Sequence, residues 1–189
     1  MAQAKTLTQA EIDQVLRYIA QKQRYSVRNR AMLLTSFYSG MRVGEIAALL
    51  VRDACNEDGS IKHEIRLSAA QTKGSVGRTV FINEKLRAEL AHYVKVHKPK
   101  HANNPLFFTE KSIGFSANSL AQWFFWVYSK AGITNASSHS GRRTFITSLA
   151  NKGVGVRVLA SLAGHKSIQV TQHYIDVNDG IKRAAVELI

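Results

Sequence analysis

Residues 139–147 read HSGRRTFIT, and residues 162–174 read LAGHKSIQVTQHY. His139 and Arg142 are three residues apart at the start of an expected helix, so their side chains share one face. A helix N-terminus also presents free backbone N–H groups to an anion. Two neighbouring guanidinium groups and an imidazole at such an end suit a phosphate, because guanidinium can hold two oxygens at once. Taken alone, the first stretch is equally consistent with a basic helix start on a solvated face.

The second stretch places a histidine and a tyrosine nine residues apart. On one continuous helix, at about 100° per residue, His165 and Tyr174 would lie on opposite faces. Gly164 and Ser167 allow a new helix to begin between them, so both rings can turn into one cleft. A single tyrosine near a C-terminus is usually a packing residue, and this pattern therefore gains weight only from its neighbours.

Periodicity along the rest of the chain predicts a mainly helical domain. Apolar spacing and helix start and stop signals predict helices over about residues 8–23, 27–38, 43–50, 84–97, 118–131, 140–151, 156–163, 167–175 and 181–188. Alternation over 61–67 and 78–82 predicts two strands joined by the glycine-containing turn at 72–77. A further turn at 56–59 predicts a third strand. The expected fold is mainly α with a small three-stranded antiparallel β-sheet.

Length and composition restrict the class of protein. The 189 residues are 45% hydrophobic and 21% charged, which indicates one globular domain over 1–189. Apolar runs are too short for a membrane helix, and the N-terminus lacks the apolar core of a secretion signal. Cys55 is the only cysteine, so no disulfide framework or cysteine-rich metal site can form. A reducing, cytoplasmic location is expected, with no membrane partner.

The charge indicates a polyanionic partner. The net charge is +13, and residues 111–175 contain lysines and arginines but no acidic residue. Such a stretch repels itself unless a polyanion supplies counter-charge, and nucleic acid is the leading candidate. An anionic membrane surface is a weaker alternative because no basic amphipathic helix stands out. A basic protein without any polyanionic partner also remains open from charge alone.

The ordered set of motifs resembles the tyrosine recombinase, or phage integrase, family, and the resemblance covers about residues 7–177. The matching stretches are SGMRVGEIAAL (39–49), QTKGSVGRTVFI (71–82) and the two quoted above. The residues that carry the resemblance are, in chain order, Arg42 with Glu45, Lys73, His139 with Arg142, His165 and Tyr174. The resemblance implies the family's catalytic-domain fold and a site-specific recombinase that cuts and rejoins double-stranded DNA through a 3′-phosphotyrosyl intermediate.

The resemblance also implies a role for each of these residues. Tyr174 would attack the phosphorus, Arg42 and Arg142 would hold the non-bridging oxygens, Lys73 would protonate the departing 5′-oxygen, and His165 would bind a phosphate oxygen. No metal or other cofactor is implied, and the scattered histidines offer no alternative metal site.

Three further residues have supporting roles in this prediction, together with His139. His139, which is counted as catalytic, would favour the phenolate or accept the phenolic proton. Glu45 would hold Arg42 or His139 in place. Arg143, about 100° around its helix from Arg142, is expected to be structural or to contact the DNA backbone. Lys166 is expected to bind DNA.

The chain differs from most family members because Arg42 follows only 41 residues, and the N-terminal core-binding domain is expected to be absent. A homo-oligomer, from dimer to tetramer, is expected on DNA, with residues 181–189 docked on a neighbour or on their own domain. Two other functions stay open: a non-catalytic DNA-binding regulator on the same fold, and a relaxing activity like that of type IB topoisomerases.

Overall fold

The computed structural model describes residues 4–110, 114–174, 183, 186 and 187. Its helices are α1 (Gln9–Lys22), α2 (Ser26–Ser39), α3 (Val43–Ala47), α4 (Val51–Ala54), α5 (Glu84–His97), α6 (Ala117–Lys130), α7 (Ser140–Asn151), α8 (Val156–Ala163) and α9 (Ile168–Gln172), with one 3-10 turn at Ala69–Gln71. Two strands complete the fold, β1 (Glu64–Leu67) and β2 (Arg78–Phe81). The expected helix over 181–188 lies outside the described residues apart from three positions.

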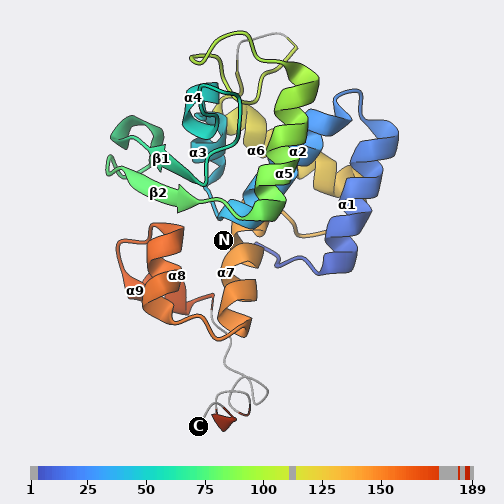
Figure 1. Cartoon of the computed structure of the whole chain (residues 1–189). Helices are drawn as coiled ribbons and strands as arrows, with labels where there is room; N and C mark the ends of the chain where they lie inside the picture. The colour runs from blue at the N-terminus through green and yellow to red at the C-terminus, as the bar shows by residue number, and fades with distance from the viewer. Residues whose placement is uncertain (1–3, 111–113, 175–182, 184–185, 188–189) are drawn as a thin grey trace.

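Helix α2 lies at the centre of the helical part, packed against α1, α5 and α7 (Figure 1). Its side chains are buried around most of its circumference, including Met32, Leu33 and Phe37. Burial on most sides, of polar residues such as Ser36 as well as apolar ones, places α2 in the interior of the protein. Helix α5 presents a single buried stripe to it, with Leu86 and Leu90.

Local sequence explains most helix boundaries. Thr8 and Glu11 form a reciprocal capping box at the start of α1, which satisfies N–H groups that the first turn leaves free. Gly40 ends α2 in the left-handed conformation, with φ of +62°. A side chain on Gly40 would also collide with Phe145, since its Cβ would lie 2.5 Å from the ring. Glycine is therefore required where α2 turns towards α3 beneath α7.

The sheet has two strands, and the expected third strand was wrong. Antiparallel pairing joins β1 to β2, with Ile65 opposite Val80. The segment before the 56–59 turn forms the short helix α4, because the Asp53 carboxylate accepts the Leu50 N–H at 2.9 Å and caps it. Only an isolated bridge between Cys55 and Ile61 remains of the expected pairing in the described residues.

The elements that carry the motifs meet at one side of this helical core. Figure 1 shows the β1–β2 hairpin next to α8 and α9, with α7 beside them. Helix α8 packs against both α7 and α9. Segments separated by more than 100 residues in the sequence are thereby brought together.

Candidate active site

Arg42 lies at the turn between α2 and α3, where its backbone and side chain are both fixed. Its backbone N–H donates to Glu45 Oε2 at 2.8 Å, and its Nη1 donates to Glu45 Oε1 at 3.0 Å. Its Nη2 donates to the carbonyl oxygen of Gly164 at 3.1 Å. These contacts tie the start of α3 to the end of α8. A guanidinium group has five N–H donors, and among the described residues two of those on Arg42 have partners.

Glu45 is 1% exposed and receives a second guanidinium group from β2. Arg78 donates to both carboxylate oxygens, from Nη2 at 2.7 Å and from Nε at 3.3 Å, and its Nη1 donates to the Leu162 carbonyl at 2.9 Å. Burial would raise the pKa of Glu45, but the hydrogen bonds and charges of Arg78 and Arg42 outweigh it and the pKa lies below its ordinary value. Glu45 is therefore ionised at neutral pH.

Arg142 extends from the first turn of α7 into the interior and is 4% exposed. Its two Nη atoms donate to the carbonyl oxygens of Gly40 and Ala163, each at 2.6 Å. Burial, followed by the charges of Arg42 and Arg78, lowers the pKa of Arg142 to about 10. The group keeps its positive charge at neutral pH, and within the described part of the chain two of its five N–H donors have partners.

Gly141, next to Arg142, allows α7 to lie against α2. A Cβ at this position would stand 1.9 Å from the Ser36 hydroxyl oxygen and 2.8 Å from its Cβ. Because Ser36 lies within the central helix, the neighbour cannot give way without moving α2. The glycine thus sets the depth at which Arg142 enters the site.

His165 and Tyr174 come together as the break between α8 and α9 predicts. Gly164 ends α8 with φ of +62°, and the two rings lie stacked with centroids 5.6 Å apart. His165 Nδ1 lies 2.8 Å from the Thr171 hydroxyl, which is fully buried. Burial, followed by the charges of Arg142, Arg42 and Arg78, lowers the pKa of His165 to about 4. The ring is therefore neutral at pH 7 before any anion binds.

Helix α7 holds Tyr174 from the other side. The Arg143 guanidinium lies over the Tyr174 ring, 5.4 Å from its centroid, and the Thr147 hydroxyl donates to the Tyr174 carbonyl at 3.3 Å. Arg143 Nε also donates to the Thr6 hydroxyl at 3.1 Å, so the N-terminal segment is linked to the tyrosine through one side chain. The sequence-based alternatives for Arg143 were structure or DNA contact, and these contacts are structural.

The hairpin places Lys73 at the edge of a pocket of about 440 Å³. Arg42, Lys73, His165 and Lys166 all line this pocket. Lys166 packs against the hairpin, since a Cβ on Gly74 would lie 3.3 Å from its Cε. Four of the predicted side chains therefore share one concave, cationic surface.

His139 stands apart from the other predicted residues. Its side chain is exposed at the start of α7, with Nδ1 3.5 Å from the Ser138 hydroxyl. In the described part of the chain no hydrogen bond joins its ring to Glu45, and the carboxylate accepts from Arg42 and Arg78 instead. Of the two partners considered for Glu45, Arg42 is the one observed.

The described residues also bear on metal binding and on membrane crossing. No group of three His, Cys, Asp or Glu side chains there could hold a metal ion. Within the same residues, no helix is long and apolar enough to cross a membrane.

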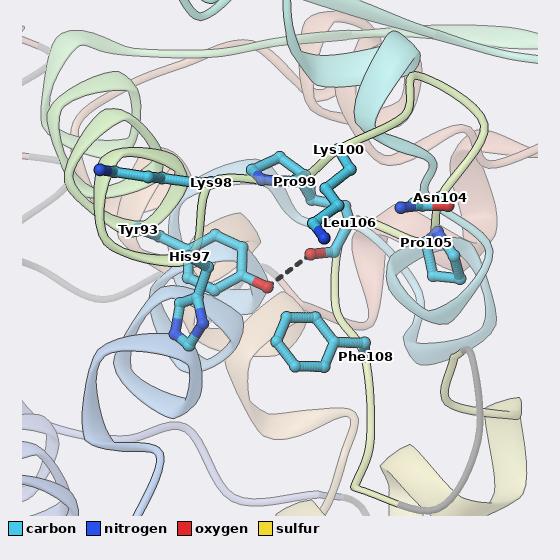
Figure 2. Close-up of a pocket in the computed structure, with 9 residues that line it drawn as sticks. All are labelled: Tyr93, His97, Lys98, Pro99, Lys100, Asn104, Pro105, Leu106 and Phe108. Atoms are coloured by element: carbon cyan, nitrogen blue, oxygen red, sulfur yellow. Dashed lines mark hydrogen bonds between the residues drawn. The ribbon is translucent and has the colours of Figure 1, made fainter.

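A separate pocket of about 430 Å³ lies at the end of α5 (Figure 2). Figure 2 shows Tyr93, His97 and Phe108 on one side of it, with the Tyr93 hydroxyl donating to the Leu106 carbonyl at 2.6 Å. This pocket contains none of the predicted site residues.

A sequence model of the phage integrase family matches residues 5–180. This chain belongs to the phage integrase family. The match spans every predicted site residue. It also agrees with the sequence-based resemblance.

Curated relatives of the chain are named tyrosine recombinases. The chain is 28% identical over 176 residues to tyrosine recombinase XerC of Lactobacillus leichmannii, covering 90% of this chain and 57% of the relative. It is 28% identical over 187 residues to tyrosine recombinase XerA of Pyrococcus horikoshii, and the match covers 97% of this chain and 60% of the relative. The chain thus spans less than two thirds of the length of these recombinases.

Solved structures share the family fold. The crystal structure of XerA recombinase matches with a TM-score of 0.75 at 23% identity, covering 100% of this chain and 64% of that one. The Tn1549 transposon integrase, in complex with transposon right end DNA, matches with a TM-score of 0.75 at 21% identity. This match covers 99% of this chain and 66% of the integrase chain. The expected catalytic-domain fold is confirmed apart from its third strand.

Arg78 is the buried charged residue of this phage integrase family site that sequence analysis missed. Its side chain is 11% exposed, although its strand reads as a surface hairpin. One signal was available, because Glu45 is the only carboxylate in a motif that is otherwise cationic. A buried carboxylate among several guanidinium groups needs its own partner.

Proposed function

We propose that this chain is the catalytic domain of a site-specific DNA recombinase or integrase, with Tyr174 as its nucleophile. The observation that supports this best is that Arg42 and Arg142 donate to the carbonyl oxygens of Gly164 and Ala163, next to His165, whose ring stacks on that of Tyr174. Two cations and a neutral imidazole suit a phosphodiester. The net charge of +13 suits the rest of the duplex.

In the proposed reaction the Tyr174 oxygen attacks the scissile phosphorus, and the bond from phosphorus to the 5′-oxygen breaks. The product is a 3′-phosphotyrosyl bond and a free 5′-hydroxyl, so the energy of the broken ester is kept for rejoining. A second 5′-hydroxyl then attacks the phosphotyrosine and releases Tyr174.

Arg142 and three residues that line the pocket, Arg42, His165 and Lys73, each have a part in this scheme. Arg42 and Arg142 stabilise the charge that develops on the non-bridging oxygens, because their geometry is fixed before DNA binds. With the Thr171 hydroxyl donating to Nδ1, His165 carries its proton on Nε2 and donates it to the same phosphate. Lys73, on the exposed hairpin, protonates the departing 5′-oxygen.

His139 has a less direct part. Its exposed position at the start of α7 is suited to accept the phenolic proton only after DNA has drawn the tyrosine towards the helix end. Lys166 lines the pocket and contacts the DNA backbone in this proposal. Double-stranded DNA and further copies of the chain, from two to four on one DNA, are the proposed partners.

A nicked suicide duplex tests the proposal. Inverted repeats next to the gene supply the candidate site. The nick lies close to the cleavage point, so the short strand that carries the new 5′-hydroxyl dissociates and rejoining cannot occur. We expect a protein–DNA adduct that survives denaturation. The adduct should be lost in Tyr174→Phe and kept in Tyr25→Phe, which removes an exposed hydroxyl bonded to Glu110.

Other outcomes reject the proposal. Binding to the repeats without any adduct would favour a regulator on the same fold. Relaxation of plasmids without site preference would favour a topoisomerase-like activity.

A further inference from the structure

Glu45 is shared unequally between its two guanidinium partners. Arg78 contacts both carboxylate oxygens and is 11% exposed, whereas the Arg42 side chain contacts one oxygen and is 31% exposed. The shorter of the side-chain contacts, 2.7 Å, also belongs to Arg78. Two parallel N–H···O bonds to one carboxylate form the strongest geometry available to such a pair. Arg78 therefore supplies most of the neutralisation of Glu45.

The inner part of the site carries more positive than negative charge. Three guanidinium groups, those of Arg42, Arg78 and Arg142, lie close enough to influence one another, and Glu45 is the carboxylate among them. The positive charge of Arg78 cancels the negative charge of Glu45. The two positive charges of Arg42 and Arg142 are then left uncancelled. A phosphodiester carries one negative charge, and the pentacoordinate species formed when a phenolate attacks it carries two.

We propose that Arg78 is a positioning residue that occupies the Glu45 carboxylate, so that the charge and the N–H donors of Arg42 stay available to the scissile phosphate. This inference rests on the proposed function. Without Arg78, the buried carboxylate would keep Arg42 as its nearest cation. Arg42 would then turn both of its Nη donors to Glu45 and away from DNA.

A second set of contacts fixes Arg78 in this role. Its Nη1 donates to Leu162 O, and its Cδ would lie 2.6 Å from a Cβ on Gly164. The side chain therefore fills the space beside the α8 terminus, where Arg42 also donates to the Gly164 carbonyl. One side chain thus fixes the hairpin, the carboxylate and the segment before His165.

A charge-balance experiment separates this role from simple packing. Arg78→Met removes the cation, and the double variant Arg78→Met with Glu45→Gln also removes the charge that it balances. We expect single-turnover cleavage to fall about 100-fold in the single variant, as when one transition-state donor is lost. The double variant should cleave at least about 10-fold faster than the single one. DNA affinity should change less than about 3-fold, because many phosphate contacts share it.

Arg66→Met is the matched control. Arg66 lies on β1, its side chain is 82% exposed, and it pairs with Glu64 outside the site. We expect wild-type cleavage from it. A double variant that cleaves as slowly as Arg78→Met would overturn the proposal, because packing alone would then explain the loss.

A measurement without DNA keeps this proposal separate from the proposed function. Inorganic sulfate, a dianion, is titrated into the protein while the ring signals of His165 are followed by ¹H–¹⁵N NMR. We expect sulfate to bind the wild type, to bind Arg78→Met about 10-fold more weakly, and to regain affinity in the double variant. Equal affinities in all three, or no binding by the wild type, would overturn the inference. Failure of the wild type to form a DNA adduct would reject the proposed function alone.

Arg78→Lys decides the matter if circular dichroism shows that the methionine variant is unfolded. An ammonium keeps the charge but cannot hold two carboxylate oxygens and Leu162 O together. We expect sulfate affinity within about 3-fold of wild type and cleavage at least about 10-fold slower. Cleavage at the wild-type rate would overturn the proposal.

Discussion

Replacing Gly164 by alanine should destabilise the protein through a collision inside the candidate active site. Gly164 has φ of +62°, and an added Cβ would lie 2.6 Å from Cδ of Arg78 and 3.1 Å from its Nε. Cδ lies in the middle of a side chain whose guanidinium is held by Glu45 and by Leu162 O. The neighbour therefore cannot move aside without losing those bonds.

The magnitude follows from two contributions. The left-handed conformation costs an alanine about 1 kcal/mol or slightly more. Weakening one hydrogen bond to a charged group costs about 2 kcal/mol further. Gly164→Ala should therefore lower the free energy of unfolding by about 3 kcal/mol.

Gly153→Ala is the matched control for this prediction. Gly153 also follows a helix, with φ of +81°, but a Cβ added there would meet nothing within 4 Å. It should lose only about 1 kcal/mol. Urea denaturation followed by circular dichroism measures both variants. Equal losses in the two would refute the close packing of Gly164 on Arg78.

Three other changes test separate contacts. Gly141→Ala should lower the free energy of unfolding, measured by urea denaturation, by about 3 kcal/mol, because its Cβ would lie 1.9 Å from the Ser36 hydroxyl. Adding Ser36→Gly to this variant should recover at least half of that loss. Between pH 6.5 and 4, His165 binds fewer protons in the folded protein, where its pKa is about 4, than in the unfolded chain. The free energy of unfolding should therefore fall as the pH falls through that window. In His165→Gln the free energy of unfolding should vary by about 1 kcal/mol less across this window, after allowance for solvent screening. The same pH profile in the variant as in the wild type would contradict the prediction. Arg143→Met removes the cation over the Tyr174 ring and should slow adduct formation about fivefold, whereas wild-type single-turnover rates would show that the contact is unimportant.

Local signals in the sequence predict the helical part of the fold well. The capping box of Thr8 and Glu11 and the stop at Gly40 both involve residues only a few positions apart, so their physical effect does not depend on the rest of the fold. The break at Gly164 likewise predicts that His165 and Tyr174 can face one cleft, and their rings are stacked.

The third strand illustrates a competition that the sequence pattern does not resolve. A turn at 56–59 followed by alternating residues is typical of a meander. The Asp53 carboxylate, however, caps the Leu50 N–H three residues earlier and favours a helical turn. The N–H of Lys62 then donates to Ala54 O, and the pairing does not extend.

Glu45 indicates that a buried cationic partner is needed, but the sequence does not show that this partner is Arg78. Its burial depends on Glu45, 33 residues earlier, and on the α8 terminus, more than 80 residues later. Neither periodicity nor motif spacing carries information about such long-range contacts. The catalytic and DNA-binding roles of all the predicted site residues, from Arg42 to Tyr174, remain predictions for the DNA-bound protein.

The central claim is that one phenol of this chain becomes joined to DNA. The most direct test is to digest the suicide-substrate adduct with protease and nuclease and to identify the nucleotide-modified peptide by mass spectrometry. The account predicts a 3′-phosphonucleotide on the Tyr174 ring oxygen. Attachment to any of the other five tyrosines, or to a serine, would contradict it.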